Sequence, residues 1–424
     1  MMFDNSYRVS TTFPVIVLCS VIFAYNYLPT ELSSPFIVLM GLLLIAASEI
    51  QFLYLKLSWP LFLILFVGFF DIVDHEMRHI LRDISFALTP ISLIFIGFWL
   101  AGKRPMWPLI LKVIVILGII TAIVHLSIFV QNPNLLSVES MVVRKETSGS
   151  GDLVVLAFVL VLFQKHYKID KLFPKILPRI IVIPVLLASI VLSYSRTELI
   201  IFVILSLSLM GWVSRLNSRM LLAIGVVMIG FITIAIVTPK DERGTYRSKI
   251  VRSVEEITIS DYKSMLDKSR NWRGYETYKA VETYLAGDSI QLIVGQGFGA
   301  LVDLGFYMPL GGDGDTSYRE IPVTHNGYVY ILVKTGLIGL ICYCIFYITV
   351  IRTSMHYSST KKNEQKMLAR LLFGCVLSLI ASMYVVGGMA QMHNTEFVLL
   401  VGYLTRKLWL FESANNQFIM VKNN

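Results

Sequence analysis

Long hydrophobic segments alternate with short polar ones along most of the 424-residue chain. A helix that crosses the hydrocarbon core of a bilayer needs about 20 mostly apolar residues, because each residue adds about 1.5 Å. Measured in this way, the hydrophobic pattern predicts twelve transmembrane helices. Their centres lie near Leu18, Leu43, Phe66, Leu93, Val115, Phe158, Leu186, Val203, Val227, Leu340, Leu379 and Val401.

One long hydrophobic segment has to be divided into two helices. Between Ile180 and Val213 the only charged residues are Arg196 and Glu198, near the middle. The segment is too long for one crossing and has the length of two short ones. We therefore predict that SYSRTE, which starts at Ser193, forms the tight turn of a helical hairpin.

One polar segment is much longer than the others and divides the chain into three parts. Residues 1–238 contain the first nine predicted helices, residues 239–325 form a large polar loop, and residues 326–424 contain the last three helices. Large loops of this kind are common carriers of functional residues.

The large loop itself contains two kinds of pattern. Residues 260–288 have the periodicity of an amphipathic helix, which Ser260 or Asp261 would cap and Gly287 would end. Residues 294–318 are rich in glycine, and we expect them to be irregular.

The composition agrees with a membrane protein. The chain is 55% hydrophobic and 15% charged, with a mean hydropathy of +0.69, whereas soluble proteins have about 25% charged residues. We therefore expect an all-α polytopic membrane protein. The net charge of +9 is typical of basic cytoplasmic loops and does not indicate nucleic acid as a partner. The four cysteines lie in hydrophobic segments and indicate neither disulfides nor a zinc site.

The basic residues predict the orientation of the chain in the membrane. With a cytoplasmic N-terminus, nineteen Lys and Arg residues lie in inner segments and five in the short outer ones. Because Lys and Arg concentrate on the cytoplasmic side, we expect both termini in the cytoplasm and the large loop outside. The five outer residues are Arg78, Arg82, Arg144, Lys145 and Arg196.

Four side chains on the predicted outer face can act on a phosphate-bearing lipid. Arg196 lies in the hairpin turn and His325 at the end of the large loop, while the predicted loop helix carries two arginines, Arg270 and Arg273. Arginine binds phosphate through two parallel hydrogen bonds and keeps its charge at any working pH. Histidine accepts a proton near neutral pH, since its unperturbed pKa is about 6.5. Taken singly, each residue also fits a cap, a solvated helix face or a membrane edge.

Two other polar features have an equally good structural interpretation. The segment DHEMRHILRD, from Asp74 to Asp83, contains two histidines and a glutamate, but an amphipathic outer connector explains it as well. The aromatic residues of the predicted loop helix can stack on sugars or dock the helix on the membrane surface, and we favour docking. They are Trp272, Tyr275, Tyr278 and Tyr284.

Four segments of the sequence carry motifs that resemble those of one protein family. HNGYVYILVKTGLIG contains a His-Asn pair and then Gly-x-x-Gly, LSYSRTELI contains a Ser-Arg helix start, and SRNWRGYETYKAV with IVGQGFGALVDLG contains Arg-x-Trp and Gly-x-Gly. In the chain, LSYSRTELI comes first and HNGYVYILVKTGLIG last. With this order, between about residues 179 and 410, the segments resemble the O-antigen ligase/polymerase superfamily, which includes WaaL-type ligases and Wzy-type polymerases. The helix layout, with one large outer loop before the last three helices, is similar too and implies a GT-C-like fold.

The resemblance implies a site and a reaction. Members of the family transfer glycans from undecaprenyl diphosphate on the periplasmic side of the bacterial inner membrane, and no metal ion or other cofactor is expected. His325 matches the family's catalytic histidine, and Arg196 matches the arginine after the hairpin turn. The loop arginine matches either Arg270 or Arg273. His325 would act as a general base on an acceptor hydroxyl, and the arginines would hold the diphosphate.

The acceptor distinguishes the candidate functions. A polymerase joins the growing chain to a new lipid-linked repeat unit, whereas a ligase transfers the finished glycan to lipid A-core. The segments WRGYE, GQGFGALVDLGF and HNGYVYILVKTG resemble surface-polysaccharide polymerases more closely, so we expect a polymerase. Its partners would be the lipid-linked donor and acceptor within the bilayer, with a chain-length regulator as a further candidate.

Three alternatives remain open. A ligase and a protein O-oligosaccharyltransferase come from the same superfamily, and a lipid-linked oligosaccharide flippase comes from a different class. Transporters usually have paired repeats and polar residues at the membrane midplane. In this chain the polar residues concentrate in one outer loop instead.

Overall fold

The computed structural model describes most of the chain in eight stretches. These are residues 12–48, 50–103, 107–136, 151–164, 176–211, 271–309, 317–360 and 362–423, with the single positions 143, 146, 147, 262, 265 and 268. The predicted helix near Val227, the predicted caps Ser260 and Asp261, and the candidate Arg270 lie outside the described residues.

Helices account for most of the described residues. Four are long and apolar enough to cross a membrane: α4 (Met77–Ala101), α5 (Trp107–Gln131), α15 (Gly327–Ser358) and α16 (Asn363–Val386). The other bundle helices are α1 (Thr12–Tyr27), α2 (Thr30–Ala46), α3 (Phe52–Val67), α7 (Gly151–Phe163), α8 (Ile176–Leu192), α9 (Arg196–Met210) and α17 (Thr395–Asn423), with short 3₁₀ turns η1 (Pro133–Leu136) and η2 (Gly388–Gln391). This is a helical bundle of the polytopic membrane type, while the number of twelve spans stays a prediction.

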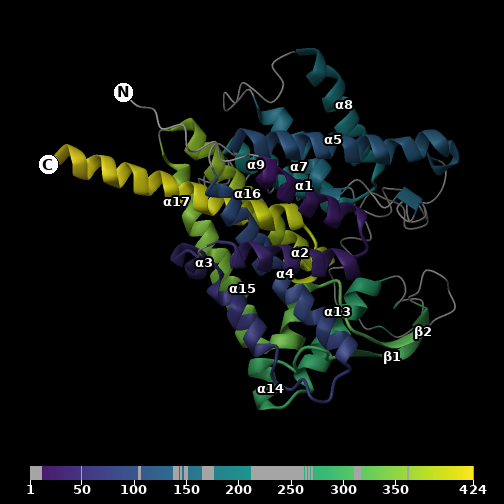
Figure 1. Ribbon diagram of the computed structural model, residues 1–424. Coiled ribbons are helices and arrows are strands. Elements are labelled where there is room, and N and C mark those ends of the chain that lie inside the picture. The colour runs from purple at the N-terminus through teal and green to yellow at the C-terminus, as the bar shows by residue number, and fades with distance from the viewer. Residues whose placement is uncertain are drawn as a thin grey trace, which may run out of the picture.

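Helix α4 packs against α2, α3 and α17 inside the bundle (Figure 1). Its contact with α17 depends on a glycine from each helix. A Cβ atom at Gly97 would lie 2.0 Å from the carbonyl oxygen of Leu399, and one at Gly402 would lie 2.2 Å from that of Ile94. Small residues bring membrane helices together in this way because lipid offers little hydrophobic driving force between them.

Hydrogen bonds join segments that are far apart in the sequence at both ends of the bundle. At one end, the amide of Phe298 in the large loop donates to the carbonyl of Gly68 after α3, at 2.8 Å. At the other end, Arg406 of α17 donates to the carbonyl of Phe98 in α4, at 2.6 Å. The predicted span centred near Phe66 is displaced, because α3 ends at Val67 and Gly68 lies at the end of the bundle beside the large loop. We call the end that holds the large loop the outer end.

The large loop folds against the outer end with a small core of its own (Figure 1). It contains helices α13 (Trp272–Leu285) and α14 (Ser289–Val294) and two antiparallel strands, β1 (Val302–Pro309) and β2 (Ser317–Ile321). Its core joins residues of the loop to the first turns of α15. They are Tyr275, Ala280, Ala300, Val302, Leu304, Ile321, Val329 and Val333.

The structure shows a helix boundary inside the predicted loop helix. Helix α13 begins at Trp272, where the side chain of Asn271 caps it by accepting a hydrogen bond from the amide of Gly274 at 3.3 Å. Met265 and Lys268, before this boundary, are also helical, and the predicted start at Ser260 or Asp261 lies outside the described residues. The Asn271 backbone is not helical, with φ −115° and ψ 52°. The predicted end is confirmed within one residue, since Ala286 is the C-cap.

The structure also corrects the prediction of an irregular, all-α loop. Residues 302–309 and 317–321 form a β-hairpin, so the all-α prediction holds for the bundle and not for the loop. In VDLG, the buried side chains of Val302 and Leu304 alternate with Asp303 and Gly305. This period of two is the mark of a strand with one buried face, and the surrounding glycines obscured it.

A break in α15 attaches the loop to the bundle. Gly336 has φ 58° and ψ −160°, and a Cβ atom there would lie 2.4 Å from the carbonyl oxygen of Ile293 in α14. Two carbonyls just before the break accept hydrogen bonds from the Gly-x-Gly segment, from Gln296 to Val333 at 2.8 Å and from Gly297 to Lys334 at 3.1 Å. The Gly-x-x-Gly and Gly-x-Gly patterns of the sequence therefore form two sides of one contact.

Candidate active site

His325 lies in the short connection between β2 and α15, at the outer end. Asn326 caps α15, because its side-chain oxygen accepts hydrogen bonds from the amides of Tyr328 at 3.1 Å and Val329 at 3.4 Å. The cap leaves the His325 side chain outside the helix, where 47% of it is exposed. The two residues of the His-Asn pair thus have separate roles, since Asn326 starts the helix and His325 stays accessible.

A buried carboxylate holds the ring of His325. Glu276 of α13 is 4% exposed, and its Oε2 lies 2.7 Å from Nδ1 of His325. The same oxygen accepts a hydrogen bond from the backbone amide of His325 at 3.2 Å. A carboxylate oxygen accepts rather than donates, so Nδ1 carries the proton and the lone pair of the neutral ring lies on Nε2. This is the tautomer that a general base requires.

Arg273 lies on the same face of α13 as Glu276. It precedes Glu276 by three residues, and residues three apart share a face of a helix. The Arg273 side chain is half-buried. We call His325, Glu276 and Arg273 the His325 site. Our sequence reasoning missed Glu276, although the spacing Arg-x-x-Glu in the loop helix was a signal for it.

Arg196 is the first residue of α9 and directly follows the turn after α8, so the predicted turn is confirmed. Ser195 caps the helix by accepting a hydrogen bond from the amide of Glu198 at 3.4 Å. The partial positive charge of a helix N-terminus adds to the charge of the Arg196 side chain. Helix α8 packs against α5 and α7, whereas α9 packs against α7 and α16.

The α16–α17 connection, residues 387–394, forms a further wall beside His325. Gln391 donates a hydrogen bond of 2.5 Å to the carbonyl of Thr324, the neighbour of His325. A Cβ atom at Gly327 would lie 2.6 Å from the carbonyl oxygen of Gly387. The connection therefore lies directly against the start of α15.

The same connection extends toward Arg196. Asn394 donates a hydrogen bond to the carboxylate of Asp152 at the start of α7. Asp152 lies close enough to Glu198 for their charges to interact, and Glu198 is in the first turn after Arg196. Arg196 and His325 thus both lie around the α16–α17 connection, although no hydrogen bond joins the two within the described part of the chain.

The α16–α17 connection adds a second histidine, which our sequence reasoning missed. The side chain of His393 is exposed, yet desolvation by the surrounding protein, together with the charge of nearby His325, lowers the pKa of His393 to about 4. The signal in the sequence was the polar run HNTE in a short outer connection.

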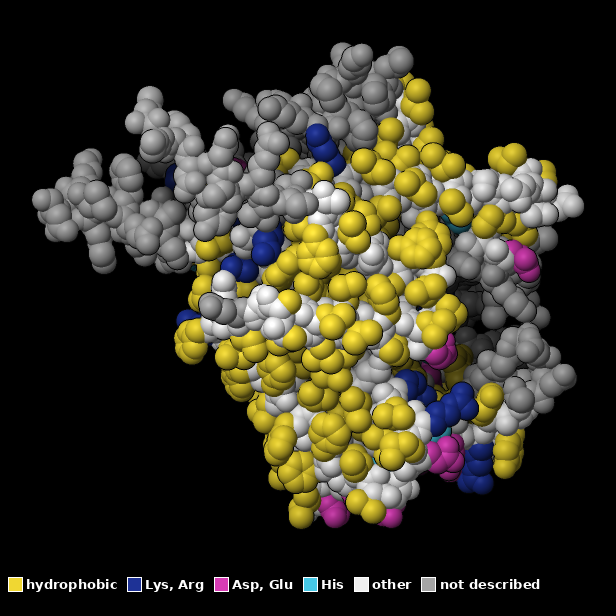
Figure 2. Space-filling view, in the orientation of Figure 1, with side chains coloured by type: hydrophobic (Ala, Val, Ile, Leu, Met, Phe, Trp, Pro, Cys, Tyr) yellow, Lys and Arg dark blue, Asp and Glu magenta, His cyan; other side chains and the backbone are white. Residues whose placement is uncertain are grey.

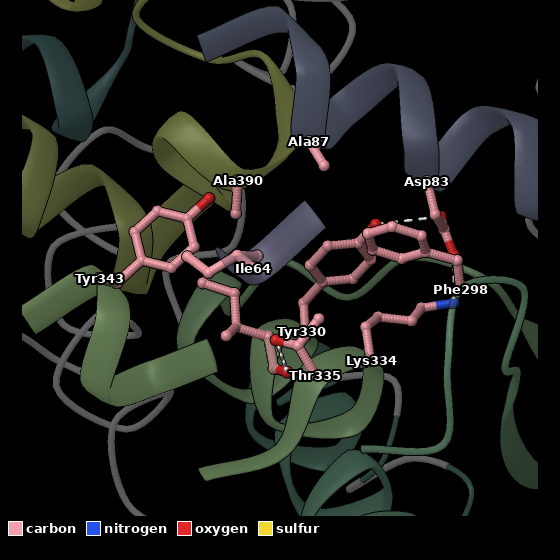
Figure 3. A pocket seen from close by; sticks show the side chains of 10 residues that line it. Ile64, Asp83, Ala87, Phe298, Tyr330, Lys334, Thr335, Tyr343 and Ala390 are labelled. Carbon is pink, nitrogen blue, oxygen red and sulfur yellow. Dashed lines mark hydrogen bonds and ion pairs between the residues drawn. The ribbon is translucent and has the colours of Figure 1, made fainter. Parts of the chain in front are cut away.

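A second polar group lies fully buried between α4 and α15, and we call it the Asp83 cluster (Figure 3). Asp83 Oδ2 lies 2.6 Å from Nζ of Lys334 and accepts the amide of Gly299 at 2.8 Å. Its Oδ1 accepts the hydroxyl of Tyr330 at 3.0 Å. Lys334 also donates to the carbonyl of Ala300. The cluster therefore ties α4, α15 and the glycine-rich segment together.

A small cavity adjoins the Asp83 cluster (Figure 3). The space open to the centre of a water molecule is about 20 Å³, enough for about one water. A sugar or a diphosphate does not fit in this cavity. In the part of the chain that the structure describes, no three His, Cys, Asp or Glu side chains are arranged to hold a metal ion.

The other polar and aromatic candidates support the fold. The ring nitrogen Nε2 of His75 lies 2.8 Å from the carbonyl oxygen of Gln296, which ties DHEMRHILRD to the glycine-rich segment. Two of the aromatic side chains that we expected on the membrane surface donate inside the loop instead. They are Tyr275, to the carbonyl of Leu304 at 2.6 Å, and Tyr284, to that of Leu292 at 2.7 Å.

These features define a membrane-embedded protein with a polar site at one end of a helical bundle. Hydrophobic side chains cover most of the face seen in Figure 2, and charged side chains gather beside α13 and the β1–β2 hairpin. Residues 181–344 match the family model Wzy_C, described as O-antigen ligase, and this confirms the resemblance to the O-antigen ligase/polymerase superfamily.

The matched segment contains the predicted arginines and His325 together with Glu276, so the match supports an enzymatic function in general. It contains neither Asp83 nor the α16–α17 connection. No curated protein matches the chain.

Proposed function

We propose that this protein is a membrane glycosyltransferase that polymerises undecaprenyl-diphosphate-linked repeat units into a surface polysaccharide on the periplasmic face of the inner membrane. One observation carries the proposal. His325 is exposed, its Nδ1 is held by the buried Glu276, and its Nε2 has no hydrogen-bond partner among the described residues, while Arg273 lies one helical turn from Glu276. A site of this kind suits proton abstraction from a sugar hydroxyl next to a bound diphosphate.

The reaction divides into proton transfer and departure of the diphosphate. His325 Nε2 takes the proton of the acceptor hydroxyl, and the oxygen forms a bond to the anomeric carbon of the donor. The bond from that carbon to the diphosphate oxygen breaks, and the diphosphate leaves with the electron pair. Arg196 and a loop arginine, Arg273 or Arg270, bind the leaving diphosphate and stabilise its charge.

A ligase is the second candidate, because the matching family model is described as O-antigen ligase. The same side chains would then act on lipid A-core as the acceptor. The polymerase is favoured by the three loop and helix segments that resemble polymerases more closely, WRGYE, GQGFGALVDLGF and HNGYVYILVKTG.

The test is turnover of the purified full-length protein with one defined lipid-linked repeat unit. A polymerase gives a ladder of products without any other acceptor, and a ligase gives product only when lipid A-core is added. The matched control is His325→Asn, whose amide nitrogen can still donate to Glu276 but has no basic lone pair. A ladder of wild-type intensity from this variant, or no product from the wild type with either acceptor, would refute the proposal. Transport of the lipid without glycan transfer would favour the flippase.

A further inference from the structure

Arg82 carries a charge that the Asp83 cluster does not neutralise. Nζ of Lys334 lies 2.6 Å from Oδ2 of Asp83, and Nη2 of Arg82 lies 3.2 Å from Oδ1 of the same carboxylate. Two cations thus share one carboxylate. Lys334 is 2% exposed, and a buried charge requires a partner more than an accessible one does. Asp83 therefore compensates Lys334, and Arg82 contributes one positive charge in excess.

The guanidinium of Arg82 reaches the segment that carries His325. Its Nη2 donates to the carbonyl oxygen of Pro322, three residues before His325, at 3.4 Å. Nε and Nη2 also donate to Asp83, at 3.4 and 3.2 Å, which fixes the plane of the group. Nη1 has no hydrogen-bond partner among the described residues, and 27% of the side chain is exposed. A fixed guanidinium with one open edge is suited to bind an oxyanion.

An excess positive charge on a membrane helix is costly unless an anion or a water-filled surface compensates it. We propose that Arg82 is an anion-binding residue of the His325 site and that its ligand is a phosphate group of an isoprenoid diphosphate. The identity of this lipid rests on the proposed function. Arg82 would approach the diphosphate from α4, whereas Arg273 approaches from α13, so the two would contact different phosphate oxygens.

The competing explanation is that Arg82 merely clamps α4 to the segment before α15. The two roles differ in what they affect, because a clamp changes stability and all ligand binding, whereas an anion-binding residue changes only the affinity for phosphate. The matched control is Arg78→Gln. Arg78 is exposed one turn earlier on α4, four residues before Arg82, and forms no hydrogen bond or ion pair within the described stretches.

The test measures binding of farnesyl diphosphate, farnesol and inorganic diphosphate to the detergent-solubilised full-length protein. For Arg82→Gln we expect about 10–100-fold weaker binding of farnesyl diphosphate, since a hydrogen bond to a charged group is lost. Arg82→Lys should fall between Arg82→Gln and the wild type, because lysine keeps the charge and lacks the fork. Binding of farnesol, the melting temperature and every property of Arg78→Gln should stay at wild-type values.

Several results would overturn the assignment. Wild-type affinity of Arg82→Gln for farnesyl diphosphate, or no binding by the wild type, would remove the evidence for an anion site. Equal losses for farnesyl diphosphate and farnesol with a lower melting temperature would show the clamp. Equally tight binding of inorganic diphosphate, or displacement by phosphatidylglycerol at equal concentration, would exclude an isoprenoid ligand. Arg82-dependent binding without glycan transfer would refute the proposed function and leave this assignment intact.

Discussion

The Asp83 cluster and the His325 site are both built around one carboxylate, yet they differ in what is left open. In the Asp83 cluster the carboxylate, the Lys334 ammonium and the Tyr330 hydroxyl all have partners, and both charged side chains are buried. In the His325 site, Glu276 occupies only one ring nitrogen, and nearly half of the ring is exposed. Polar groups whose hydrogen-bond partners all lie within the protein stabilise the fold. A polar group with an unoccupied hydrogen-bonding atom can bind a substrate and react with it.

The comparison also separates two kinds of sequence signal. A lysine and an aspartate in hydrophobic helices are costly in a membrane, which invites a functional interpretation. Here they neutralise each other and hold the glycine-rich segment through Gly299 and Ala300. A pair of charges that is fully buried and mutually satisfied therefore indicates a structural joint rather than a site of reaction.

The largest effect should come from removing the open ring nitrogen. We expect His325→Asn to reduce turnover about 10²–10⁴-fold, because general-base catalysis typically contributes that much. The melting temperature should stay at the wild-type value, since the amide can still bond to Glu276. Turnover and thermal unfolding are measured on the same preparation. A melting temperature of His325→Asn well below that of the wild type would show that His325 stabilises the fold.

The opposite pattern is expected for the buried cluster. Asp83→Ala leaves the Lys334 charge without a partner and should lower the free energy of unfolding by about 3–5 kcal/mol. Adding Lys334→Met should restore most of this loss, because the double variant contains no unpaired charge. Thermal unfolding in detergent measures both. If the double variant is as unstable as Asp83→Ala, the contacts with Tyr330 and Gly299 dominate rather than the charges.

A smaller loss of activity should follow from changing the residue that holds His325. Glu276→Gln can donate to Nδ1 and so favours the tautomer with the proton on Nε2, which cannot act as a base. Loss of a hydrogen bond to a charged group corresponds to about 10–100-fold in turnover. Glu282→Gln is the control on the same helix, because the Glu282 side chain is exposed and its one partner among the described residues is Lys279. Equal turnover of the two variants would remove Glu276 from the site.

The smallest effect should appear in the pH dependence of stability. The pKa of His393 is lowered to about 4 in the folded protein, compared with about 6.5 in an unfolded chain. Between these values the unfolded state binds more protons, so the titration of His393 makes stability fall as the pH decreases from 6.5 to 4. His393→Gln should lose less stability over this range than the wild type. Parallel plots of melting temperature against pH for the two proteins would contradict the lowered pKa of His393.

Local sequence patterns determined the parts of the structure that depend on neighbouring residues. The hydrophobic segments predicted the helices, Arg196 and Glu198 marked the turn between α8 and α9, and the His-Asn pair marked the start of α15. These features follow from capping, charge and periodicity, which act within a few residues. The β-hairpin was not predicted, because alternation of buried and exposed residues over a few positions between glycines is a weak signal.

Only the tertiary structure decided which polar residues meet. Glu276 and His325 are 49 residues apart, and Asp83 and Tyr330 are 247 apart, so no spacing in the sequence could pair them. These residues meet because distant helices pack side by side in the bundle. The contact between Gly336 and the segment around Gly295 also holds the large loop against α15. Hydrophobicity and charge in the sequence predicted which segments form helices and which residues are costly to bury. Whether such a residue is closed off by a partner or left open to a substrate depends on contacts between distant segments, and these exist only after the chain has folded.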